Sequence, residues 1–206
     1  MRQALAWIFA PALEHRRELL AVNIAYFGVV VLGMLVILVS PEIQTSLLQS
    51  VGEAFSPTGS LGPLVQAYET GDLPTAITLT FLVNLILGAG VFITLPSVAI
   101  PYAGLIMGAY RALLWGLIFS PFAGVFPLAT LPHVLTALIE GEAYIVAMLG
   151  VALWWNRVVR APGARWEAWV SGLKYQGRIY ALVAFLLAVA AIYEVLEVVL
   201  LLPRLM

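Results

Sequence analysis

The chain contains no cysteine, and only 10% of its 206 residues are charged. Without cysteine, the chain has no disulfides, no thiolate nucleophile and no cysteine-ligated metal or iron–sulfur site. The scarcity of charge excludes a water-soluble globular domain, because such a domain needs far more charged side chains to cover its surface. The net charge of −1 also provides no basic surface for nucleic acid. The exterior of the molecule must therefore face an apolar solvent.

Hydrophobic residues make up 63% of the chain, and its mean hydropathy is +1.02. In a lipid bilayer only helices and closed barrels satisfy every backbone polar group. The apolar runs are long and unbroken, which favours helices over the short alternating segments of a barrel. We therefore predict an all-α fold: a polytopic helical bundle of the cell membrane, forming a single membrane domain over residues 1–206.

Apolar runs of about twenty residues, the length that crosses a hydrocarbon core of about 30 Å, predict five transmembrane helices. Pro41 ends the first run, while Pro96 and Pro101 divide the long run after Pro74 into a tight hairpin. The predicted spans cover about 19–40, 74–96, 98–120, 131–155 and 177–202.

The segments between the spans indicate the orientation. Residues 1–18 are interrupted by Pro11 before a charged cluster, which is typical of an amphipathic helix on the inner membrane face and not of a signal peptide. Residues 41–73, the predicted outer segment, carry four acids and no Lys or Arg, whereas 156–176 form a basic inner loop. The positive-inside rule thus places the N-terminus inside. A four-span alternative, with the hairpin merged, would place 157–178 outside and is disfavoured.

Ionisable side chains within the predicted spans are the candidate functional residues, because each costs several kcal/mol in lipid unless it is paired or hydrated. Counted from the span ends at about 1.5 Å per residue, several lie roughly 12–16 Å below the outer boundary. This predicted buried polar layer comprises Asn84, Arg111, Glu140, Glu142 and Glu194, with His133 and Glu197 as possible accessory residues.

Arg111 is the single cation of the predicted layer, so we expect it to pair with Glu140 or Glu142. These two acids point about 200° apart on a helix, and both can hardly reach one partner. The other acid needs a different partner, for which His133, Asn84, a second copy of the chain or a proton are alternatives.

Glu194 and Glu197 share a helix face, and we expect Glu197, which is nearer the membrane exit, to reach water. We expect His133, which follows Pro132 at a span entrance, to hydrogen-bond locally. A lone histidine beside scattered carboxylates is weak evidence for a metal site, so neither a metal nor a cofactor is predicted.

Two stretches carry a family resemblance. FLVNLILGAGVFITLPSVAIPYAGLIMGAYRALLWGLIFSP (81–121) and LPHVLTALIEGEAYIVAMLG (131–150) resemble the stage II sporulation protein M family in an Asn of the second span, a Gly-rich third span and a Pro-His before a Glu-bearing fourth span. Family members often have a Pro-His-Gly motif with a glutamate about one helical turn after it. In this chain Val134 follows the Pro-His pair, and the acids come later, at Glu140 and Glu142. The resemblance implies a multi-spanning, non-enzymatic component that, in spore formers, assembles with peptidoglycan-degrading proteins during engulfment. Relatives occur in organisms without spores.

These observations support two functions. The first is a scaffold or assembly component of a membrane or cell-envelope complex, whose partners are the lipid bilayer and other membrane or envelope proteins. The alternative is a transporter or channel component that uses the polar layer. An intramembrane enzyme is not predicted, because EGEAY has no HExxH or second histidine motif beside it. The GxxxG spacing of Gly104 and Gly108 is compatible with a homodimer.

Overall fold

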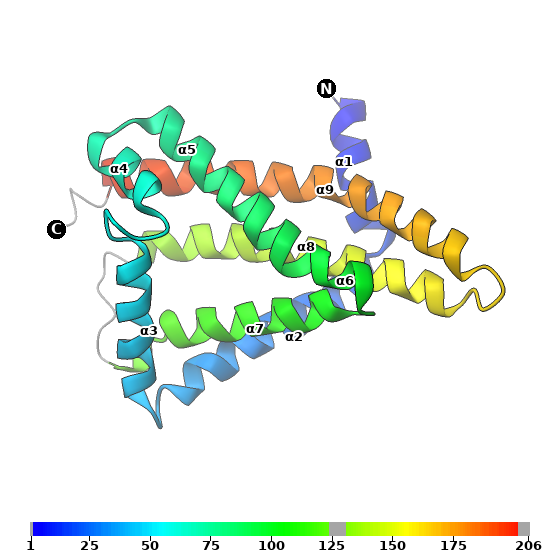
Figure 1. Cartoon of the computed structure of the whole chain (residues 1–206), viewed down its shortest axis with the longest axis horizontal. Coiled ribbons are helices and arrows are strands. Elements are labelled where there is room, and N and C mark those ends of the chain that lie inside the picture. The colour runs from blue at the N-terminus through cyan, green and yellow to red at the C-terminus, as the bar shows by residue number, and fades with distance from the viewer. Residues whose placement is uncertain (1, 124–130, 202–206) are drawn as a thin grey trace.

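The computed structural model describes residues 2–123 and 131–201, and the regular elements of that part of the chain are helices (Figure 1). Most are α-helices, η1 and η4 are π-helical, and η2 is a short 3₁₀ turn. The elements are α1 (Arg2–Glu14), α2 (Arg16–Val36), α3 (Pro41–Ala54), α4 (Gly62–Thr70), α5 (Leu73–Leu82), η1 (Val83–Thr94), α6 (Leu95–Ala99), α7 (Ala103–Ile118), η2 (Pro121–Ala123), α8 (Leu131–Val159), α9 (Arg165–Leu196) and η4 (Glu197–Leu201).

Four helical rods are long and apolar enough to cross a membrane, which makes the chain a multi-pass membrane protein. They cover Arg16–Val36, Leu73–Ala99, Pro132–Val159 and Arg165–Leu201. The second rod is the unbroken series α5–η1–α6. Helix α7 is also apolar, but its 16 residues span about 24 Å at 1.5 Å per residue, less than a full hydrocarbon core. All of these rods run along the long axis of the molecule (Figure 1).

Helix α8 is the centre of the bundle. Of its apolar stretch 67% is buried, against 11% for α2 at the periphery. It packs most extensively on α9 and also contacts α2, α7 and η1. Tyr144, Ile145 and Trp154 are fully buried along it. Because α8 is the most buried of the long helices, most of its side chains from Glu140 to Trp155 face protein.

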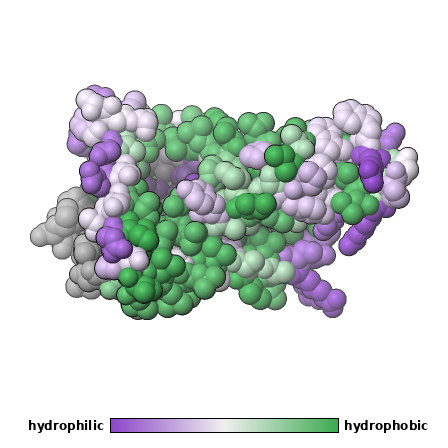
Figure 2. All heavy atoms as spheres, turned by 60° about the horizontal axis from the view of Figure 1, so that its bottom comes forward, coloured by the Kyte–Doolittle hydropathy of each residue, from purple (hydrophilic) through white to green (hydrophobic). Residues whose placement is uncertain are grey.

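The two ends of the bundle differ in character. At one end α3 lies across the long helices and α4 sits beside α5 (Figure 1). We call residues 41–73 the cap and this the cap end; the opposite end, with the α8–α9 turn at 160–164, is the turn end. Figure 2 shows hydrophobic surface between these ends, and hydrophilic side chains gathered at both. This distribution matches a bilayer-spanning band flanked by two polar surfaces.

Glycines allow close helix contact inside the bundle, and this corrects one expectation from the sequence. A Cβ on Gly108 would meet the Met148 side chain of α8, and one on Gly104 would lie 2.8 Å from Ser97 Oγ. Both glycines are buried. The GxxxG face of α7 is therefore used in packing within the chain. It is not available for the homodimer contact that its spacing suggested.

The segment predicted as a basic inner loop, 156–176, is mostly helical, which is a second correction. Helix α8 continues to Val159 and α9 already begins at Arg165. The α8–α9 interface extends beyond the apolar stretch, where Trp154 of α8 stacks on Trp155 and makes an edge-on contact with Trp169 of α9. At the other end of α9, residue 202 of the last predicted span lies outside the described residues.

Candidate functional site

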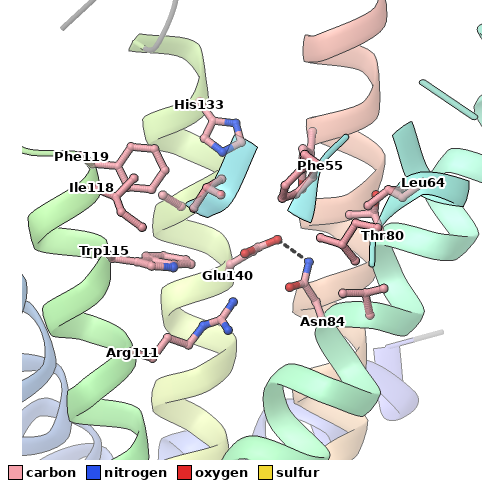
Figure 3. A pocket seen from close by; sticks show the side chains of 15 residues that line it. Phe55, Leu64, Thr80, Asn84, Arg111, Trp115, Ile118, Phe119, His133 and Glu140 are labelled. Atoms are coloured by element: carbon pink, nitrogen blue, oxygen red, sulfur yellow. Dashed lines mark hydrogen bonds between the residues drawn. The ribbon is translucent and has the colours of Figure 1, made fainter. Parts of the chain in front are cut away.

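A polar cavity of about 290 Å³ lies near the cap end of the bundle (Figure 3). Its walls come from η1, α7, α8 and α9, and the cap covers it with side chains of α3 and α4. The polar residues that line it are Thr80, Asn84, Arg111, His133, Glu140 and Glu194. Four of the five residues of the predicted polar layer are thus brought to one cavity, and Glu142 is the one that is not.

Asn84 is the central link of the network. Its Nδ2 donates to Glu140 Oε1 at 2.7 Å, and its Oδ1 accepts from the Tyr144 hydroxyl at 2.7 Å. Both amide atoms are used, which fixes the orientation of the Asn84 side chain. Since Glu140 and Tyr144 are four residues apart on one face of α8, a single amide from η1 engages two successive turns of that helix.

Arg111 has a partner that the sequence analysis did not predict. Its Nη2 donates to the Tyr144 hydroxyl at 2.9 Å, and its guanidinium carbon lies 4.1 Å from the Tyr144 ring centre and 5.4 Å from that of Trp115. Among the described residues no carboxylate lies within 4.0 Å of the guanidinium. The predicted ion pair with Glu140 or Glu142 is therefore wrong, because Tyr144 occupies the position next to the guanidinium.

Glu142 lies on the other side of α8. It is half-buried and accepts a 3.4 Å hydrogen bond from Asn23 Nδ2 of α2. This agrees with the opposite directions expected of Glu140 and Glu142 on a helix. Glu142 thus ties α8 to α2 and does not line the cavity.

Glu194 connects the cavity with the cap. The Tyr68 hydroxyl, on α4, lies 3.2 Å from Glu194 Oε1 and 2.9 Å from Thr80 Oγ1. Burial, and next the charge of Glu194, raise the pKa of the Tyr68 phenol well above its usual value. Glu140 lines the same cavity as Glu194, so two carboxyl groups share its wall.

Glu197 and His133 depart from the sequence-based expectations. Glu197 is only 2% exposed: its Oε2 accepts from Thr136 Oγ1 at 3.0 Å, and its Oε1 lies 3.5 Å from His133 Nδ1. The expectation that Glu197 reaches water is wrong, because at the end of α9 its side chain faces α8 and is held there by Thr136. His133 of α8 lies next to this acid at the end of α9, where the sequence analysis expected a local hydrogen bond.

Several site residues were not found from the sequence. Tyr144 and Trp115 each have a usable signal, since Tyr144 follows Glu140 by four residues and Trp115 follows Arg111 by four. Tyr68 has none, because its position depends on how the cap folds back onto α9. Within the described ranges, no three His, Cys, Asp or Glu side chains converge as metal ligands.

Comparisons with family models, with curated proteins and with solved structures find no match. The site is therefore interpreted from its own geometry. It combines an arginine, at least two acids and aromatic rings in a cavity whose walls include helices long and apolar enough to cross a membrane. Polar groups are costly at that depth, so such a concentration of them is a functional-site hypothesis on physical grounds.

Proposed function

We propose that the protein is a non-enzymatic multi-pass protein of the cell membrane that binds a small polar ligand in the polar cavity, as a transporter or channel component. One observation carries this proposal: Asn84, Arg111, Glu140 and Glu194 all line a single cavity of about 290 Å³. A layer that served only to hold helices together would place its polar groups against each other without a cavity. Space beside charged side chains at membrane depth supports a ligand or a file of water.

The volume limits the ligand. Because a water molecule occupies about 30 Å³ of liquid, the cavity has room for about ten waters or for one small metabolite. The aromatic rings of Phe55, Trp115 and Phe119 line part of the wall and suit the apolar portion of such a molecule.

The orientation belongs to the same proposal. We propose that α7 is the fifth crossing element, extended by residues 119 and 120 where the chain reaches the cap end. Arg157, Arg160 and Arg165 lie at the turn end, whereas the cap holds acids and no Lys or Arg. The positive-inside rule then places the turn end and the N-terminus in the cytoplasm and the cavity in the outer half of the membrane.

Under this proposal the cap is the cover of the cavity on the outer side. Val51 and Phe55 of α3, Leu61, and Leu64 of α4 form part of the lining. Entry from outside then requires a movement of α3 or α4, because their side chains lie over the polar groups. Short helices held by few contacts are the elements in which such opening is common.

Cysteine accessibility tests the proposal directly, since the chain has no native cysteine. Single cysteines at Ala137 and Val83, which line the cavity, are expected to react in membranes with a charged, impermeant maleimide. Gln49→Cys on exposed α3 is the positive control, and Leu32→Cys, which is 59% exposed on the lipid-facing α2, is the unreactive control. If Ala137→Cys and Val83→Cys are as unreactive as Leu32→Cys from both sides, the cavity is not a ligand or transport site.

An assembly role is the second candidate, because α3 exposes apolar side chains beyond the membrane band. Leu48 is 40% exposed and Val51 37% exposed on it, and Phe55, directly after this helix, is 43% exposed. A scaffold would place a membrane or envelope protein on this surface. A photocrosslinking residue at Leu48 is expected to yield one discrete adduct in native membranes. Absence of an adduct, with normal maleimide reactivity in the cavity, would exclude the assembly role and leave ligand binding as the proposed function.

The resemblance to the stage II sporulation protein M family stays a prediction.

A further inference from the structure

Arg111, Glu140 and Glu194 line the polar cavity, and within the described residues Arg111 forms no salt bridge with either acid. Arg111 donates to a phenol through Nη2, and no hydrogen bond within the described part of the chain uses its Nη1. Its guanidinium therefore has donors to spare for an anionic oxygen group on the cavity side. Arginine is also the side chain that best matches a planar carboxylate or a phosphate.

Glu140 and Glu194, the acids that line the cavity, have free hydrogen-bond acceptors and lack donors. Among the hydrogen bonds within the described residues, Glu140 accepts one from Asn84 and Glu194 accepts one from Tyr68. Each carboxylate has about four acceptor positions, so acceptor positions remain for a donor in the cavity. Because both carboxyl groups line the same cavity, a cation bound there would lower the repulsion between them. An ammonium group brings three N–H donors to such a position.

These two observations together specify a ligand with charges of both signs. We propose that the cavity binds a zwitterionic group, with an anionic carboxylate or phosphate at Arg111 and an ammonium at Glu140 and Glu194. The proposal rests on the ligand-binding function proposed above and adds the chemical class of the ligand. Trp115 lies beside the guanidinium and closes the wall next to the anionic end.

The same chemistry occurs in free amino acids and in the headgroup of phosphatidylethanolamine. An apolar groove of about 310 Å³, lined by residues of α2, α7 and α8, shares Trp115, Phe119 and Ala137 with the polar cavity. Acyl chains of a lipid would lie in that groove. A free zwitterion would leave it unused, so the two sources can be told apart by filling the groove.

The test uses the purified full chain in an uncharged maltoside detergent, because zwitterionic detergents would compete. Glycine and phosphoethanolamine represent the zwitterion, while ethylamine, acetate and phosphate carry one charge each. Isothermal titration is expected to give at least tenfold tighter binding for a zwitterion than for any single-charge probe. Equal affinities for all soluble probes, or no binding of any, would overturn the proposal when the lipid experiment described below also shows no preference for phosphatidylethanolamine.

Two variants separate the ends of the site. Arg111→Gln is expected to reduce zwitterion affinity to that of ethylamine, and Glu194→Gln to reduce it to that of acetate or phosphate. Arg178→Gln and Glu142→Gln are matched controls, since both residues lie away from the cavity. If the controls lower the affinity as much as the two site variants, the assignment of the ends is wrong.

Because a site variant could fail to fold, protection of the otherwise native chain provides a second measurement. Glycine or phosphoethanolamine is expected to slow maleimide labelling of Ala137→Cys at least threefold, whereas ethylamine and acetate are not. Labelling that no zwitterion slows would overturn the zwitterion proposal and leave a water-accessible cavity. Absence of labelling without any ligand would instead contradict the proposed function itself.

The lipid arm uses native mass spectrometry after reconstitution with phosphatidylethanolamine or with phosphatidylglycerol, which lacks the ammonium. Selective retention of phosphatidylethanolamine, lost in Met34→Trp where the groove is filled, identifies a lipid headgroup as the source. Binding of glycine or phosphoethanolamine that Met34→Trp does not change identifies a free zwitterion. Equal retention of the two lipids and equal affinities for all soluble probes would overturn the proposal.

Discussion

Asn84 and Glu140 are hydrogen-bonded to each other in the wall of the polar cavity, with the amide nitrogen of Asn84 2.7 Å from Glu140 Oε1 (Figure 3). Glu140 is only 7% exposed. A buried carboxyl group with one strong donor depends on that donor, because the loss of a buried partner costs about 1–3 kcal/mol. The same amide also holds Tyr144, and through it Arg111.

Asn84→Asp is therefore expected to be strongly destabilising. The substitution replaces the donor with a second acid facing Glu140, and we expect the free energy of unfolding to fall by about 2–3 kcal/mol. The double variant Asn84→Asp, Glu140→Gln exchanges the roles of donor and acceptor and should recover at least half of the loss. Thermal unfolding in detergent measures both. A double variant less stable than the single one would show that the pair does not act through this hydrogen bond.

Gly172 and Gly177 on α9 provide a matched test of helix packing. A Cβ on Gly172 would lie 2.8 Å from Trp154 Cγ, whereas one on Gly177 meets nothing within 4 Å. Gly172→Ala should cost about 1–3 kcal/mol, because Trp154 is fully buried and cannot move aside. Gly177→Ala should be neutral or stabilise by up to about 1 kcal/mol through helix propensity. Equal melting temperatures of the two variants would contradict the α8–α9 packing.

Tyr68 predicts a pH dependence for the attachment of the cap. Its pKa is raised in the folded protein, by burial and by the charge of Glu194, so the unfolded state loses the phenol proton first as pH rises. The stability from this hydrogen-bonded phenol is fully present below about pH 10, the unfolded value, and is lost as pH rises above it. Tyr68→Phe should be less stable than the native chain at pH 7 but lose less between pH 9.5 and 11. Parallel curves of melting temperature against pH would contradict this role.

The proposed orientation can be checked with two exposed positions. Gly163 lies in the α8–α9 turn with open space around it, and Gln49 is exposed on α3. In intact cells an impermeant maleimide should label Gln49→Cys and not Gly163→Cys, and inverted vesicles should reverse the pattern. Labelling of both from one side would place the cap and the turn on the same face and exclude an odd number of crossings between them.

Much of the fold could be predicted because its physical cause is local. A run of about twenty apolar residues can cross a bilayer only as a helix, whatever its neighbours are. The proline-bearing break between α6 and α7 was predicted near PSVAIP, and the helices separate there at residues 100–102. The common depth predicted for the polar residues of the spans comes from counting residues from the end of each predicted span. That count brought Asn84, Arg111, Glu140 and Glu194 to one level, and all four line one cavity.

The remaining features depend on how each helix is rotated and where it ends, which no single segment specifies. The hydropathy of a span is the same for any rotation about its axis, so it could not show that Arg111 meets Tyr144 or that Gly104 and Gly108 face inward. Glu197, at the end of α9, is buried beside Thr136 of α8, a contact that depends on how α9 is rotated against α8.

Composition and apolar run length by themselves determined that this chain is a helical membrane protein with ionisable groups at one depth, because the cost of exposing backbone or charge to lipid applies to each segment separately. Only the tertiary structure decided which side chain each of those groups faces. Side-chain partners are set by helix rotation and by packing against α8, and those are properties of the assembled bundle.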